Sequence, residues 1–208
     1  MSNRNQWLAL LALLALQGCD SSNKPASTSP PPKADAAVSA PAATAQTAAW
    51  DGMNLECLNT LKQGIFPSAE EKCSRSVIEA EKFGAADQRF ASSMVNLGVS
   101  LQAQKKYPKA EENFLRAVII QEKVLGPNHA EVGNTLNKLV EAYNAQNKYQ
   151  VAEPQMRRSL DILEKTQGPD HISVAAGLEN LAAALKGLGR ATEAVAFEQR
   201  AVGIRSLK

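Results

Sequence analysis

The sequence predicts an all-α protein built of about four antiparallel helix pairs, and three observations point to that class. First, the chain aligns with itself without gaps when it is shifted by 42 residues, which indicates successive copies of one structural unit. Second, apolar residues in each copy recur at i, i+4, i+7 and i+11, the spacing of one face of an α-helix. Third, aromatic residues make up only 5% of the 208 residues and alanine is abundant, which favours close helix packing over a sheet.

Each copy contains two helical patterns. The second pattern carries small residues at Ala110, Ala152 and Ala194, which let two antiparallel helices approach closely. A degraded copy precedes the first clear one, so the expected helix pairs cover residues 51–83, 87–124, 129–166 and 171–206. The apolar face of the first helix in the three clear copies consists of Phe90, Met94, Leu97, Leu101, Val132, Leu136, Leu139, Tyr143, Val174, Leu178, Leu181 and Leu185.

The motif Gly-Pro-(Asn/Asp)-His occurs twice, at residues 126–129 and 168–171. Its glycine can end a helix, its proline prevents continuation, and its Asn or Asp can cap the next helix. Asn128 and Glu131 fit a capping box. The two histidines then lie in the first turns of equivalent helices, too far apart for one metal ion to bridge. We therefore expect a structural role for both histidines and no metal site.

The amino-terminal segment has the pattern of an export signal. Arg4 precedes an apolar run, Trp7–Leu16, that is too short to span a bilayer but has the length of a signal-peptide core. The next residues, Leu-Gln-Gly-Cys, resemble a bacterial lipobox, which implies removal of residues 1–18 and acylation of Cys19, with an ordinary secretory signal as the alternative. Asp20 resembles an inner-membrane retention signal. The resemblance thus implies a lipid-anchored protein of the cell envelope that faces the periplasm.

Residues 19–49 are rich in Pro, Ala, Ser and Thr, and after Asp20 their only large aliphatic residue is Val38. Such a segment buries too little apolar surface to offset its ordering entropy, so we expect a disordered tether. The "SPPPK" stretch leaves proline-rich docking open as an alternative. The helical domain is then expected to occupy residues 50–208.

The repeated unit resembles the tetratricopeptide repeat, and its 42-residue period resembles the variant found in kinesin light chains. The resemblance is carried by "LNKL" at 136–139, by the segment 147–171 and by "GLENLAAAL" at 177–185. It implies that the helix pairs stack into a right-handed superhelix, or solenoid. Two residues depart from the family pattern: Lys138 replaces an asparagine, and Glu198 replaces an apolar residue.

The resemblance further implies that a protein or peptide partner binds to a concave face lined by the first helix of each pair. Asn96 and Asn180 are the strongest candidates, because an amide side chain both donates and accepts hydrogen bonds, as an extended peptide backbone requires. The alternative for any one of these positions is an ordinary solvated helix surface. The candidate residues of this face are Ser92, Asn96, Val99, Gln102, Asn134, Lys138, Glu141 and Asn180.

Two cysteines, Cys57 and Cys73, lie in the degraded first copy. In an oxidising compartment two thiols usually pair, and a disulfide here would join the two helices of the weakest repeat. Two buried free thiols are an alternative. A redox-active pair is a third, although the Cys-x-x-Cys spacing typical of such pairs is absent.

Composition and motifs also limit the function. The net charge of +2 offers no strong field for nucleic acid, and we find no phosphate loop, zinc-protease motif or nucleophile elbow. We therefore expect neither an enzyme nor a cofactor. The sequence predicts a membrane-anchored module that recruits or holds a protein partner in the envelope. The alternative is a permanent structural subunit or assembly factor of an envelope complex, such as outer-membrane or pilus machinery.

The final helix is expected to leave apolar side chains open to solvent. Val195, Phe197, Val202 and Ile204 all lie on it. An exposed apolar end predicts a homodimer or a partner contact through this helix.

Overall fold

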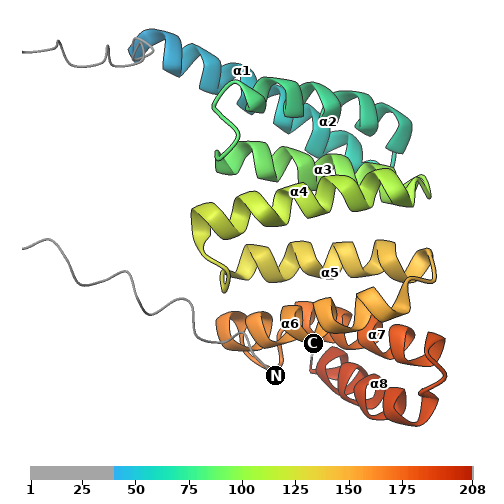
Figure 1. Ribbon diagram of the computed structural model, residues 1–208. Coiled ribbons are helices and arrows are strands. Elements are labelled where there is room, and N and C mark those ends of the chain that lie inside the picture. Colours follow the sequence, from blue (N-terminus) through green and yellow to red (C-terminus); the bar gives the residue numbers. More distant parts are fainter. Residues whose placement is uncertain (1–39, 208) are drawn as a thin grey trace, which may run out of the picture. The chain divides into compact units, whose positions relative to one another are not determined.

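The structure is a computed structural model that describes residues 40–207, with side chains from Thr44 onward. The predicted signal peptide, Cys19, Asp20 and most of the predicted tether lie outside these residues. The described part is entirely helical and forms four antiparallel hairpins that follow one another along the chain (Figure 1). This confirms the predicted all-α solenoid of four helix pairs. The helices are α1 Ala40–Lys62, α2 Phe66–Glu81, α3 Gln88–Ala103, α4 Tyr107–Leu125, α5 Ala130–Ala145, α6 Tyr149–Gln167, α7 Ile172–Gly187 and α8 Ala191–Ser206.

Helix α1 begins earlier than predicted. The tether was expected to extend to residue 49, but residues 40–49 form the first turns of α1. Thr47, in this stretch, accepts a hydrogen bond from Arg89 Nη1 on α3 at 3.3 Å. The segment lacks the apolar periodicity that marked the other helices, but its alanines have the highest helix propensity and extend a helix already packed in the hairpin.

One residue with positive φ recurs in the turn inside each hairpin, at Gly64, Lys105, Asn147 and Gly189. Their φ angles lie between 59° and 78°, in the left-handed region that glycine and asparagine tolerate best. Lys105 is therefore the costliest residue of this set. The recurrence shows that the period extends to the backbone conformation of the turns.

The Gly-Pro-(Asn/Asp)-His motif caps the following helix, but through a different residue from the one expected. His129 and His171 are the N-cap residues, and their Nδ1 atoms accept the backbone N–H of Glu131 and Ser173 at 3.2 Å. The predicted caps, Asn128 and its counterpart in the next repeat, lie one residue outside. The correction follows from the helix starting one residue later, which gives the histidine the extended backbone of an N-cap.

The inter-hairpin loops are held by the next hairpin. Arg158 on α6 donates to the carbonyl oxygen of Pro127 at 3.1 Å, and Arg200 on α8 donates to that of Pro169 at 3.2 Å. These pairs are related by 42 residues. The repeated Gly-Pro motif is thus a structural junction between hairpins.

Carboxylates of the second helices link successive hairpins. Glu70 accepts hydrogen bonds from Lys106 at 2.6 Å and from Gln104 at 2.8 Å. Glu153 on α6 likewise pairs with Arg190 at 2.7 Å. The ammonium of Lys106, hydrogen-bonded to Glu70, lowers the pKa of that carboxyl group below its usual value. The stabilisation from this contact is therefore present above the ordinary carboxyl pKa and is lost as the pH falls through the lowered pKa.

Most of the apolar core runs through the last three hairpins, where Phe114, Leu136, Leu139 and Leu163 are fully buried or nearly so. The first hairpin has a separate small cluster made of Cys57, Ala69 and Cys73.

Cys57 on α1 and Cys73 on α2 form a disulfide, with their Cα atoms 4.7 Å apart. Of the three states considered for these cysteines, the structure has the bonded one. The hairpin is also tied to the next by Trp50, whose Nε1 donates to Ser93 Oγ at 2.9 Å.

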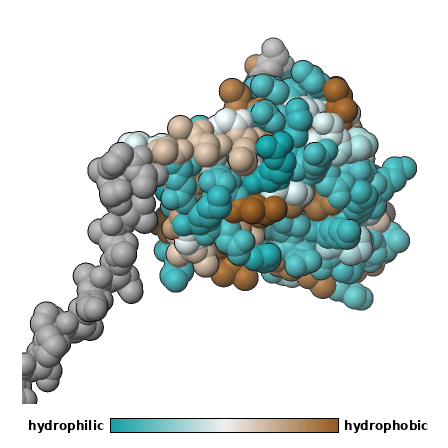
Figure 2. Space-filling model, turned by 90° about the horizontal axis from the view of Figure 1, so that it is seen from above, coloured by the Kyte–Doolittle hydropathy of each residue, from teal (hydrophilic) through white to brown (hydrophobic). Residues whose placement is uncertain are grey.

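The last helix exposes some of its apolar residues, as expected. Ile204 is buried and Phe197 is partly buried against the core, whereas Val195 and Val202 are exposed. At the opposite end of the stack, seen from above in Figure 2, hydrophobic side chains occur in small groups among hydrophilic ones.

Ion pairs occupy positions of α8 where α6 has core residues. Glu198, the counterpart of the buried Met156, pairs with Lys186 at 2.5 Å. Arg205 pairs with Glu179 at 2.6 Å. Glu198 is thus accommodated by a cation of α7.

Candidate functional site

The first helices of the hairpins line one side of the stack. Helices α1, α3, α5 and α7 contact one another in series, whereas the second helices of successive hairpins make no such contacts in the described residues. A stack whose first helices approach more closely than its second helices curves toward the first helices. The side expected to be concave is therefore the side on which the predicted binding residues lie.

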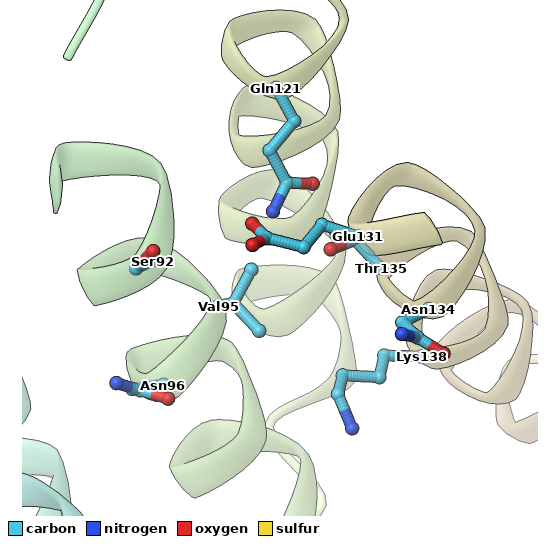
Figure 3. Close-up of a pocket in the computed structure, with 8 residues that line it drawn as sticks. All are labelled: Ser92, Val95, Asn96, Gln121, Glu131, Asn134, Thr135 and Lys138. Atoms are coloured by element: carbon cyan, nitrogen blue, oxygen red, sulfur yellow. The ribbon is translucent and has the colours of Figure 1, made fainter. Parts of the chain in front are cut away.

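A pocket of about 200 Å³ opens between α3 and α5. It brings together four of the eight predicted residues, since Ser92 and Asn96 come from α3 and Asn134 and Lys138 from α5 (Figure 3). This volume is below the roughly 300–1,000 Å³ of typical small-molecule sites, so it suits one or two side chains of a larger partner. The eight lining residues are Ser92, Val95, Asn96, Gln121, Glu131, Asn134, Thr135 and Lys138.

Three of the other predicted residues bind one another. Glu141 accepts hydrogen bonds from Gln102 Nε2 at 2.7 Å and from Asn180 Nδ2 at 3.4 Å, linking α3, α5 and α7. Val99 is partly buried against the core. These four residues do not line the pocket between α3 and α5, and the amide of Asn180 is already engaged within the chain.

Asn96 bonds to the equivalent residue of the preceding repeat, which the prediction did not include. Its Nδ2 donates to Asn54 Oδ1 on α1 at 3.1 Å. Counting back 42 residues from Asn96 leads directly to Asn54, so the period contained the signal. The equivalent positions of the next two repeats are Lys138 and Asn180. Within the described residues Lys138 has no ion pair or hydrogen bond, so its ammonium is available to a partner.

Gln121 is the most unexpected residue of the pocket, because it comes from a second helix, α4. Its side chain is only 3% exposed, and its Oε1 has no hydrogen-bond partner in the structure. In the next repeat the same position is Leu163, which is fully buried. A polar residue in place of a core leucine was the available signal, and the prediction missed it by confining the site to first helices.

Glu131 also escaped prediction as a site residue, because the sequence assigned it to a helix cap. Its carboxylate accepts hydrogen bonds from Gln88 Nε2 at 3.1 and 3.3 Å. No cation pairs with it in the described residues. The pocket therefore has two unlike ends: Gln121 and Glu131 supply acceptors at one, and Lys138 supplies a cation at the other (Figure 3).

In residues 40–207 no group of three or more His, Cys, Asp or Glu side chains is placed to hold a metal ion. Among the same residues, none of the helices has the length and hydrophobicity needed to cross a bilayer.

Solved structures with this fold are similar over most of the chain. BtubC (BKLC) of P. vanneervenii matches with a TM-score of 0.69 and 20% identity, covering 76% of this chain and 63% of its own. A Podosopora anserina chain of kinesin-light-chain type, with nearly identical TPR-like repeats, matches with a TM-score of 0.62 and 23% identity, covering 76% and 75%. Its Q17M variant gives a TM-score of 0.64 at 22% identity, covering 76% and 74%. This chain thus spans less than two thirds of the length of BtubC.

A comparison with curated proteins found no match. Family models described as tetratricopeptide repeat match residues 89–165 and 174–206, which together make up more than half of the chain. Proteins of this family are generally non-catalytic scaffolds that bind other proteins. The matched residues, the four stacked hairpins and the similar structures agree, and the chain belongs to the tetratricopeptide-repeat family.

Proposed function

We propose that this protein is a non-catalytic interaction module that holds a protein partner on its concave face while Cys19 anchors it to a membrane of the cell envelope. The observation that carries the binding role is the pocket between α3 and α5. There, side chains from three helices converge. Both the Lys138 ammonium and the side-chain oxygen of Gln121 lack partners within the described residues. Buried polar groups are normally satisfied, so unsatisfied groups in a pocket favour a ligand.

The anchoring role rests on the sequence Leu-Gln-Gly-Cys after the apolar run. The resemblance of Asp20 to a retention signal favours the inner membrane. Several acyl chains on one cysteine anchor far more firmly than a single chain. Replacing Cys19 with alanine should abolish labelling by radioactive fatty acid and leave the signal segment uncleaved. Unchanged labelling of Cys19→Ala would refute the anchor while leaving the binding role untouched.

The binding role is tested by removing two pocket side chains at once. The double variant Asn96→Ala/Lys138→Ala should lose its partners in a cross-linked pull-down from envelope extract. The matched control is Asn113→Ala/Lys123→Ala, which removes the same two residue types from α4, outside the pocket. The control should retain the partners at wild-type level.

Equal retention by both double variants would contradict a role for the pocket. It would favour the alternative role, a permanent subunit of an envelope assembly that is held through another surface. Such a subunit is expected to use a large interface and to remain bound through stringent washing.

A further inference from the structure

We propose that the pocket between α3 and α5 receives a basic side chain, Lys or Arg, of an extended partner segment. Its cationic group would lie against Glu131 and Gln121, and an acidic group of the same segment would meet Lys138. This inference rests on the proposed function and specifies the class of partner. It follows from the balance of donors, acceptors and charges in the pocket.

At one end of the pocket, the Glu131 carboxylate and the side-chain oxygen of Gln121 have no charged donor in the described residues. Gln121 Oε1 is buried and has no donor, and the carboxylate of Glu131 receives only the neutral amide of Gln88. Figure 3 shows the side-chain ends of Gln121 and Glu131 close together above Val95, with the amide nitrogen of Gln121 on the side of the carboxylate. Lys and Arg carry donors and no acceptor. Their positive charge would also pair with the Glu131 carboxylate, which has no cationic partner in the described residues.

At the opposite end, the pocket is cationic. Lys138 extends away from Glu131, and the amides of Asn96 and Asn134 lie on either side of it (Figure 3). A carboxylate placed here would gain a charge-assisted hydrogen bond from the ammonium. Two unlike ends give the groove a direction, because reversing the peptide would bring like charges together.

The size and lining of the pocket suit this guest. A volume of about 200 Å³ accommodates the end of one long side chain, and Val95 offers an apolar surface for its methylene stem. A bound water molecule could satisfy Gln121 Oε1, but it would bring no charge to Glu131.

The experiment selects peptides from a random twelve-residue display library on the full-length protein in detergent. The same selection is run on Glu131→Gln, on Lys138→Gln and on the control Glu112→Gln, an exposed glutamate of α4 outside the pocket. Wild type and the control should enrich peptides that contain both a basic and an acidic residue. Glu131→Gln should lose the basic preference, and Lys138→Gln the acidic one. The affinity of a selected basic peptide should fall about tenfold in Glu131→Gln.

A second variant separates binding from folding. Gln121→Leu installs the leucine that the next repeat has at this position and removes a buried unsatisfied amide, so it should raise the melting temperature. It should also weaken the same basic peptide severalfold, which no loss of fold could explain.

The outcomes distinguish this inference from the function on which it rests. If wild type enriches peptides without a basic preference, or if Glu131→Gln binds basic peptides as well as wild type, the inference is overturned and the binding role stands. If wild type enriches no peptides beyond those captured by Asn96→Ala/Lys138→Ala, the proposed use of the pocket fails as well.

Discussion

The first hairpin, α1–α2, and the third, α5–α6, are both antiparallel helix pairs but are stabilised differently. In the third, Leu136, Leu139 and Leu163 are almost completely buried. In the first, the fully buried residues of the cluster between the helices are Cys57, Cys73 and Ala69, with Leu61 partly buried against them, and the two cysteines are bonded. The comparison shows that a hairpin with few large buried apolar side chains can be held by a covalent link between its helices.

A disulfide and a buried leucine side chain contribute free energies of similar size. Burying a leucine side chain contributes roughly 1.5–3 kcal/mol. Closing a loop between cysteines separated by 16 residues in sequence contributes about 3 kcal/mol in the chain-entropy model. The disulfide thus replaces about one or two buried leucines.

The largest expected effect lies in the third hairpin. Leu139→Ala should lower the free energy of unfolding by about 2–5 kcal/mol, because it leaves a cavity in the continuous core. Leu61→Ala, at a partly buried position of the first hairpin, should cost clearly less. Urea denaturation followed by circular dichroism measures both. Equal losses would show that the two hairpins do not differ in apolar stabilisation.

A smaller loss is expected in the first hairpin. The double variant Cys57→Ala/Cys73→Ala should lose about 3 kcal/mol, mainly as local opening of α1 and α2. Hydrogen exchange should accelerate at the amides of these helices while protection in α5 and α6 is retained. Reduction of the wild type with dithiothreitol in mild denaturant should reproduce the pattern. Uniform acceleration over the whole chain would instead mean that the disulfide supports the entire stack.

The smallest effect concerns the turns. Lys105 has the same left-handed backbone, with φ of 60°, that Gly64 adopts in the first hairpin and Asn147 in the third. Lys105→Asn should therefore raise the free energy of unfolding by a few tenths of a kcal/mol to about 1 kcal/mol, because asparagine tolerates this conformation better. Thermal melting would detect the gain as a slightly higher Tm. No gain would mean that the Lys105 side chain compensates for the strain.

The sequence predicted the hairpins and their order but not every helix boundary. The 42-residue period predicted four hairpins, because helix faces recur along the chain and depend on local spacing. It did not predict that α1 extends back to Ala40, since that segment has helix propensity without periodicity. Nor did it predict His129 as the N-cap, because a shift of one residue at a helix start depends on backbone geometry that the pattern does not encode.

Part of the candidate site was likewise predictable from the sequence, and part was not. The sequence by itself proposed eight positions on the first helices, of which Ser92, Asn96, Asn134 and Lys138 meet in one pocket, whereas Val99 packs against the core. Only the tertiary structure placed Gln121 and Glu131 beside them. Helical periodicity describes one helix at a time, whereas a pocket forms from side chains of helices that are distant in sequence, and their meeting depends on how hairpins pack.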